Sequence, residues 1–354
     1  MKLTVFDRSD WGRIRLTGAD RVRFLHNQTT NHIEALSAGK GCHTVFVTST
    51  GRTLDLATVY ALPESLLVIV SPGMAQPIYD WMDRYIFFSD KVTLTDESDQ
   101  SFLFTVLGDG ADEVARALGA ADLIGQANFQ HCPVDVQVAA PTEPISVAVG
   151  SDLAIAGYTV WGPTSQSQRI WQTILDAGAN SGTTAQWESL RIQQGRPMPQ
   201  HELTDDDNPL EAGLWHSVSF EKGCYIGQET IARLNTYQGV KKRLWGFALA
   251  GDRLDASDTS DTSDTSDAAQ IVGTALWSDG AKVGKITSVA QTDSGLLGLG
   301  YLRTKAGGEG LTVEVKAEVK AEDAEAQVGE TTTGAISGTA IALPFISHEY
   351  YGSH

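Results

Sequence analysis

The pattern of predicted secondary structure changes near residue 240, and this change is the strongest constraint on the fold of the chain. Before that point strand-like and helix-like segments alternate, whereas after it strand signals follow one another with almost no helix between them. The later strand signals cover residues 244–249, 271–277, 282–289, 296–302 and 336–343. Closely spaced strands without helices are typical of a small antiparallel barrel or sandwich. We therefore expect two domains, one of residues 1–239 and one of residues 240–354.

The first domain mixes hairpins with crossover helices. Residues 43–48 and 53–62 are rich in Val, Thr and Tyr and flank Gly51, which predicts a β-hairpin. Apolar residues at helical spacing predict a helix over 74–88, and a further helix is expected to end at Gly195. This mixture favours the α+β class over a doubly wound parallel sheet.

The composition excludes several classes of function. The 354 residues include 26 basic and 44 acidic side chains, a net charge of 26 − 44 = −18, which argues against a general coat for DNA or membranes. No apolar run reaches the roughly 18–20 residues that span a bilayer, and the first residues lack the apolar core of a signal peptide. Three cysteines are too few for a disulfide framework. We therefore predict a cytoplasmic protein without a membrane partner.

Half of the negative charge lies in two insertion-like segments of the second domain, because residues 251–267 and 305–330 have net charges of 1 − 6 = −5 and 3 − 7 = −4. A tandem Ser-Asp-Thr repeat near 255–267 predicts a disordered loop, since it has almost no apolar residue to bury. A near-repeat of Val-Lys-Ala-Glu begins the segment 313–330, which either extends a hairpin or forms a short solvated helix. Residues 222–243 carry five bases and one acid, so this segment is locally basic within an acidic chain, and we call it the basic island.

The densest chemical signal is a turn between two glycines, Gly223 and Gly227, that contains Cys224. Glycines at both ends predict a sharp turn with close backbone approach, and a helix is expected to begin near Gly227. Cys224 then lies just before a helix N-terminus and beside Lys222, and both features stabilise a thiolate. We therefore expect Cys224 to be the most reactive of the three thiols. A small buried cysteine that fills a tight turn is the alternative on local grounds.

The run Lys222-Gly-Cys-Tyr-Ile-Gly-Gln-Glu229, followed by Ala232 and Arg233, resembles the signature of the YgfZ-type folate-binding proteins. These are iron–sulfur cluster assembly or repair factors related to the aminomethyltransferase (T-protein) of the glycine cleavage system. The resemblance is closest to cyanobacterial and plastid members, and it implies an α+β fold of two related α+β units around a central cavity, followed by a C-terminal antiparallel β-barrel. Further segments that resemble this family are residues 24–31, 190–197 and 208–214.

The same resemblance implies the ligand and the site. Tetrahydrofolate or a one-carbon derivative is the expected cofactor, and Cys224 is the expected functional thiol. No bound metal or cluster is expected, because the eight histidines show no metal-ligand spacing and the cysteines form no Cys-x-x-Cys pair. The residues expected to bind the folate are Tyr60, Gln193, Lys222, Gln228, Glu229 and Arg233.

Two departures from the family pattern limit what the resemblance implies. The aminomethyltransferases have a pair of carboxylates on the strand that ends like Val59-Tyr60, and the functional second carboxylate corresponds to Leu56. Asp55 remains, but neighbours on a strand point to opposite faces, so Asp55 is not expected to replace that carboxylate. Gln193 stands where the family usually has an acid, and an amide offers a pterin one acceptor oxygen and no charge. Aminomethyl transfer is therefore not expected to be the main activity.

Three functions follow in order of preference. The first is a tetrahydrofolate-binding accessory factor for iron–sulfur cluster assembly or repair, whose partners are client or assembly proteins and which thereby serves cluster-dependent enzymes such as those that modify tRNA. The second is a folate-dependent aminomethyl- or methyltransferase. The third is a non-catalytic module that binds RNA or protein through the basic island, and direct RNA binding is the least favoured partnership.

Overall fold

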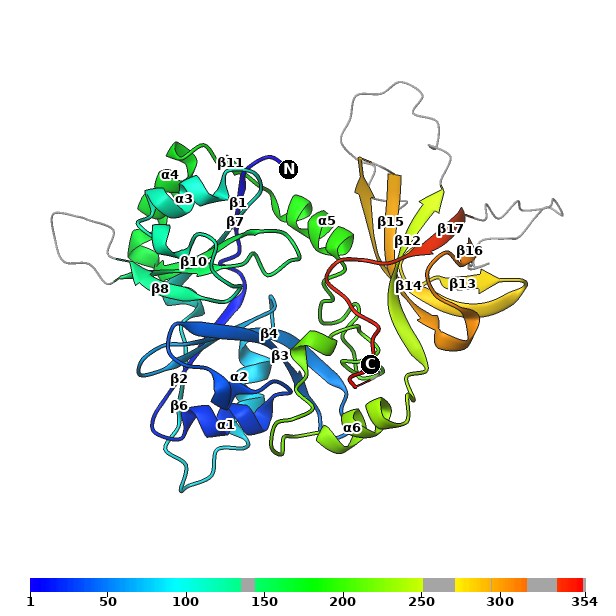
Figure 1. The fold of residues 1–354 in the computed structure, drawn as a ribbon, viewed down its shortest axis with the longest axis horizontal. Coiled ribbons are helices and arrows are strands. Elements are labelled where there is room, and N and C mark those ends of the chain that lie inside the picture. Colours follow the sequence, from blue (N-terminus) through cyan, green and yellow to red (C-terminus); the bar gives the residue numbers. More distant parts are fainter. Residues whose placement is uncertain (135–143, 251–270, 294, 317–335, 353–354) are drawn as a thin grey trace, which may run out of the picture.

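The computed structural model describes residues 1–134, 144–250, 271–293, 295–316 and 336–352. Two β-sheets with their helices and a closed barrel are distinct in Figure 1. The predicted insertion near 255–267 and residues 317–330 of the second insertion lie outside the described residues. The remainder of that second segment belongs to a strand of the barrel, so the hairpin interpretation holds there.

The first sheet has the strand order β3-β4-β5-β2-β6, and each pair of neighbouring strands in it is antiparallel. Helices α1 (Arg21–Gln28) and α2 (Ala75–Asp83) pack their buried side chains against one face of this sheet. Gly51 adopts a φ of +75° between β3 and β4, so the predicted hairpin forms and its turn needs a glycine. The strands are β2 (Gly12–Thr17), β3 (Lys40–Val47), β4 (Thr53–Ala61), β5 (Leu66–Val70) and β6 (Thr93–Asp96).

The second sheet has the order β11-β1-β7-β10-β9-β8 and takes in the first strand of the chain. That strand, β1, pairs antiparallel with β7 and parallel with β11, so the two α+β units are interleaved along the sequence. Helices α3 (Ala111–Ala117) and α4 (Ser167–Asp176) cover one face. The strands are β1 (Thr4–Asp7), β7 (Ser101–Leu107), β8 (His131–Val134), β9 (Ile145–Val149), β10 (Gly157–Pro163) and β11 (Asn180–Ser181).

The faces of the two sheets that are free of these helices share one aromatic core. Tyr60 and Leu67 from the first sheet meet Leu103 and Trp161 from the second, and Trp187 joins them from helix α5 (Thr184–Gln194). Helix α5 begins with a capping box at Thr183 and ends at a left-handed glycine, as its sequence predicts. This shared core holds the two units together.

The C-terminal strands close into a barrel with the order β12-β15-β14-β13-β16-β17. Helix α5 contacts β14 and β15, and residues 237–241 join helix α6 (Gln228–Thr236) to the barrel. The predicted α+β class and antiparallel barrel are confirmed. None of the helices in the described part of the chain is long and apolar enough to cross a bilayer. The barrel strands are β12 (Lys242–Ala250), β13 (Ala275–Ser278), β14 (Ala281–Thr292), β15 (Gly295–Arg303), β16 (Thr312–Lys316) and β17 (Ile336–Ile341).

Candidate functional site

Lys222 is a buried anchor for the loop that precedes α6. Its Nζ donates to the backbone carbonyl oxygens of His26, Thr29 (2.6 Å) and Asn31 (2.8 Å), at and beyond the C-terminal end of α1. The last carbonyls of a helix lack internal partners and favour a cation, so Lys222 satisfies groups that α1 leaves open. Burial lowers the pKa of Lys222 to about 7. The ammonium that was expected to bind folate is therefore already held by three protein carbonyls.

Cys224 is exposed, two residues after this anchor. The interpretation as a small buried cysteine is therefore wrong. The other two free thiols are partly buried, and burial raises the pKa of Cys42 to about 12 and also raises that of Cys132. Cys224 is thus the most accessible of the three thiols, and the ammonium of Lys222 is held by backbone carbonyls.

Helix α6 carries three of the predicted folate residues on its solvent side. Gln228 is partly buried, Glu229 is exposed, and the side chain of Arg233 is 71% exposed and lies 3.8 Å from the Glu229 carboxylate. Ile231 between them is fully buried, so the helix has one clear inner face. This group shares a surface with Cys224, since the loop runs directly into α6.

Tyr60 and Gln193 belong to another part of the molecule. Tyr60 lies in the core shared by the two sheets and stacks on Trp161, with ring centroids 4.6 Å apart. Gln193 is partly buried on α5 and donates to the Ser189 hydroxyl at 3.0 Å. Cys42 and Tyr60 lie on neighbouring strands, but Cys42 packs in the core on the α1 side whereas Tyr60 packs in the inter-sheet core. The structure thus divides the predicted site residues into two groups.

The positions of Asp55 and Leu56 agree with the expected loss of a free carboxylate. Asp55 accepts hydrogen bonds from the Ser71 backbone N–H (2.8 Å) and hydroxyl (2.7 Å). Burial raises its pKa to about 6 against the effect of these bonds. Leu56 is fully buried and packs with Val45 and Leu210 in a separate core cluster. The two side chains therefore lie on opposite faces of β4, and neither offers an accessible carboxylate.

A buried ionic cluster, which sequence reasoning missed, is centred on Asp152. This carboxylate lies 2.7 Å from a guanidinium nitrogen of Arg8, 2.7 Å from Nε2 of His43 and 3.0 Å from a guanidinium nitrogen of Arg196, and it accepts from the Thr58 hydroxyl at 3.0 Å. Burial alone would raise the pKa of Asp152, but the two arginines hold it well below its ordinary value of 3.8. The partners come from distant segments, so only the positive φ of Asp152 (+65°) marks it locally, and that is invisible in a sequence.

Two of the five bases of the predicted basic island form ion pairs. Lys242 Nζ lies 2.6 Å from the Asp207 carboxylate, and the guanidinium of Arg243 lies 5.2 Å from the centre of the Tyr350 ring. Together with the Arg233–Glu229 pair, these contacts leave less free positive charge than the sequence suggests. A phosphate backbone needs such free charge, so the structure does not favour RNA as a partner.

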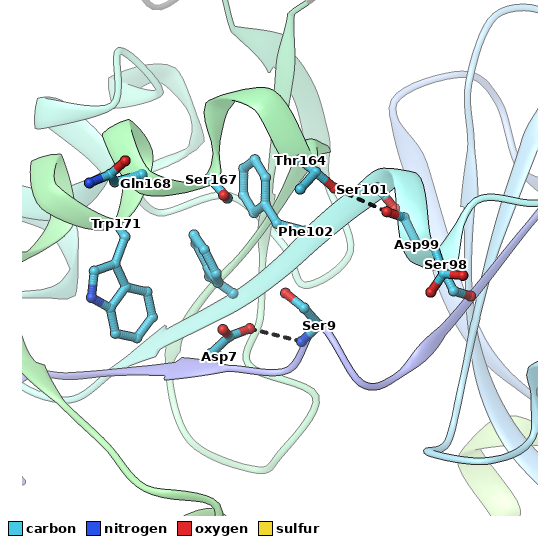
Figure 2. Close-up of a pocket in the computed structure, with 11 residues that line it drawn as sticks. Asp7, Ser9, Ser98, Asp99, Ser101, Phe102, Thr164, Ser167, Gln168 and Trp171 are labelled. Atoms are coloured by element: carbon cyan, nitrogen blue, oxygen red, sulfur yellow. Dashed lines mark hydrogen bonds between the residues drawn. The ribbon is translucent and has the colours of Figure 1, made fainter.

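Two cavities of similar volume lie in the described part of the chain, and neither is lined by Cys224 or by a residue of helix α6. One, of about 470 Å³, is lined by the aromatic rings of Phe102 and Trp171 and by the acidic residues Asp7 and Asp99 (Figure 2). The second, of about 430 Å³, lies between the two sheets and is lined by residues of both. Trp161, the stacking partner of Tyr60, is part of its wall. This second cavity is therefore the one that adjoins a predicted folate residue.

Residues 1–222 match the sequence profile of the GCVT N-terminal domain. The chain belongs to the GCVT domain family. A protein of Arabidopsis thaliana named "Putative transferase, chloroplastic" is 42% identical over 321 residues, which cover 90% of this chain and 69% of that protein. An aminomethyltransferase of Caldanaerobacter subterraneus is 29% identical over 257 residues, covering 70% of this chain and 66% of that protein. The expected relationship to aminomethyltransferases is confirmed, while the narrower YgfZ-type assignment stays a prediction.

The crystal structure of the glycine cleavage system aminomethyltransferase T from Bartonella henselae superposes with a TM-score of 0.78. The match covers 99% of this chain and 88% of that one at 17% identity. At 17% identity, this match shows that the two proteins share a fold. The compartment stays a prediction, because the plant relative is named as chloroplastic and cytoplasm was expected from the sequence.

Proposed function

We propose that this GCVT-family chain is a tetrahydrofolate-binding accessory factor for iron–sulfur cluster assembly or repair that acts through the Cys224 thiol. One contrast carries the proposal: the thiol is exposed on an anchored loop, whereas the position implied for the transferase carboxylate is the buried Leu56. An anchored, exposed thiol can reach a partner protein without a large rearrangement. Without a carboxylate at position 56, aminomethyl transfer lacks the group that the family resemblance implies as its general base.

The folate is proposed to enter the cavity between the two sheets. Its volume of about 430 Å³ falls within the range of small-molecule pockets. Trp161 offers the aromatic surface on which a pterin or aminobenzoate ring stacks, with Tyr60 behind it. Arg15 lies in the wall, paired through two contacts with Glu97, so a glutamate carboxylate of the folate would exchange with Glu97 at this guanidinium. Gln193, Gln228, Glu229 and Arg233 stay predicted folate contacts, and Lys222 is assigned to positioning the loop.

Isothermal titration with a polyglutamylated tetrahydrofolate tests the ligand. We expect saturable binding by the full chain and weaker binding by Arg15→Ala, with Arg116→Ala on an exposed helix as the matched control. A flat titration of the wild-type chain would contradict folate binding. Equal affinities for the three proteins would instead remove the inter-sheet cavity as the site.

Complementation of a deletion strain tests the thiol. Cys224→Ala should keep the fold and folate binding but lose complementation, whereas Cys132→Ala, which changes a partly buried thiol, should complement. Normal growth of the deletion strain with Cys224→Ala would contradict the role assigned to this thiol.

A folate-dependent aminomethyltransferase is the second candidate, favoured by the names of the relatives. Incubation with an aminomethylated donor and tetrahydrofolate discriminates between the two. The proposal predicts no formation of methylenetetrahydrofolate above the level without protein, and sustained turnover would establish the transferase in its place.

A further inference from the structure

Three metal-binding side chains meet beside the loop of Cys224. His26 comes from the last turn of α1, and His32 and Glu34 come from the start of the short helix η1 (Ile33–Ala35). Their donor atoms all lie within 4.8 Å of one another. The spacing His-x5-His-x-Glu crosses the end of a helix, so the sequence alone does not show that the three side chains converge.

The three groups differ in a way that suits a metal site. The side chain of His26 is only 4% exposed and fixes the position of one ligand, whereas His32 and Glu34 are exposed and free to adjust.

The distances require only a modest closure. His26 Nε2 lies 3.8 Å from the Glu34 carboxylate, and donors around a tetrahedral zinc ion lie about 3.4 Å apart. The exposed side chains can supply this movement. His26 Nδ1 accepts a long hydrogen bond of 3.4 Å from the Glu34 backbone N–H. Binding through Nε2 moves the imidazole proton to Nδ1, so this contact is lost and the two N–H groups must move apart.

We propose that His26, His32 and Glu34 form a binding site for a divalent first-row transition metal, with further coordination positions open to solvent. Two imidazoles and one carboxylate are a ligand set used by catalytic zinc and by non-haem iron. The loop of Cys224 borders the site, because a β-carbon added at Gly223 would lie 3.8 Å from His26 Nε2. The metal site does not depend on folate or on the proposed role of the thiol.

Titration of the metal-free full chain with Zn²⁺ tests the site. We expect saturable binding of one ion and a loss of affinity of at least about tenfold in His32→Ala and in Glu34→Gln, since loss of outer partners alone already costs that much. Both changes affect exposed side chains, so the fold is retained. His201→Ala, which removes another exposed histidine, should bind like the wild type.

Two further results decide the proposal. Co²⁺ should give the visible spectrum of a low-coordinate site in the wild type, and this spectrum should be lost in His32→Ala but kept in Cys224→Ala. Wild-type affinity in both His32→Ala and Glu34→Gln would overturn the proposal. So would loss of binding in Cys224→Ala with retention in His32→Ala, because the thiol would then be the ligand.

Discussion

The Asp152→Asn variant tests how the two sheets are joined. The carboxylate pairs with the guanidinium groups of Arg8 and Arg196, and all three side chains are buried. Removing one member of such a cluster leaves charges unpaired in the interior and typically costs about 3–5 kcal/mol. We therefore expect the free energy of unfolding to fall by this amount.

The expected loss converts into a measurable shift in melting temperature. An unfolding entropy of about 2.1 cal/mol/K per residue gives about 0.74 kcal/mol/K for 354 residues, so the melting temperature should fall by about 4–7 °C. Tryptophan fluorescence suits the assay, because the Arg8 guanidinium lies 3.6 Å from the centre of the Trp11 ring and 4.4 Å from that of Trp187. The signal then reports on the cluster itself.

Thr58→Val is the matched control, because it removes one hydrogen bond to the same carboxylate but no charge. It should cost about 1.5–3 kcal/mol and lower the melting temperature by about 2–4 °C. The reasoning is refuted if Asp152→Asn melts within about 1 °C of the wild type, since the arginines would then not need the charge. It is also refuted if the two variants are equally destabilised.

Three further predictions concern stability measured by urea unfolding. Lys222→Met should lose about 3 kcal/mol, because three backbone carbonyls lose their donor, and wild-type stability would show that water replaces it. Gly227→Ala should lower the free energy of unfolding more than Gly178→Ala does. Both glycines have positive φ, but an added β-carbon meets a backbone oxygen, at 2.4 Å, only at Gly227. Equal losses of stability in the two variants would contradict this account. Burial raises the pKa of Asp55 from 3.8 to about 6, so the folded state holds this proton more tightly than the unfolded chain and loses stability as pH rises through about 4–6. Asp55→Asn removes this effect and should gain about 3 kcal/mol relative to the wild type between pH 4 and pH 7, and a pH-independent difference between the two proteins would count against it.

Local patterns predicted most of the architecture. The hairpin at Gly51, the capped helix before Gly195 and the closely spaced C-terminal strands all appear where the sequence places them. These features depend on neighbours in the chain, so hydrophobic period and turn residues were enough to find them. Strand β1 was not predicted, because its four residues are too few to show the alternation of buried and exposed side chains that marks a strand.

The candidate site was predictable only in part, because its decisive contacts join distant segments. The turn around Cys224 is visible in the sequence, but the exposure of its thiol was left open there and comes from the structure. The three acceptors of Lys222 are backbone carbonyls, which no residue type indicates. The partners of Asp152 likewise lie more than 40 residues away in both directions, and no local pattern links them.

The pairing of β1 determines how long this strand stays without its partner strands during synthesis on the ribosome. Thr4 of β1 is paired with Leu107 of β7 and with Asn180 of β11. At about 5–20 residues per second, β7 emerges about 5–20 s after β1 and β11 about 10–35 s after it, and each edge of β1 stays unpaired until its partner has emerged. Contacts of such long separation also slow folding. Among the described strands, β1 therefore has the longest wait for a partner strand, and it is a segment of the nascent chain that a chaperone would protect.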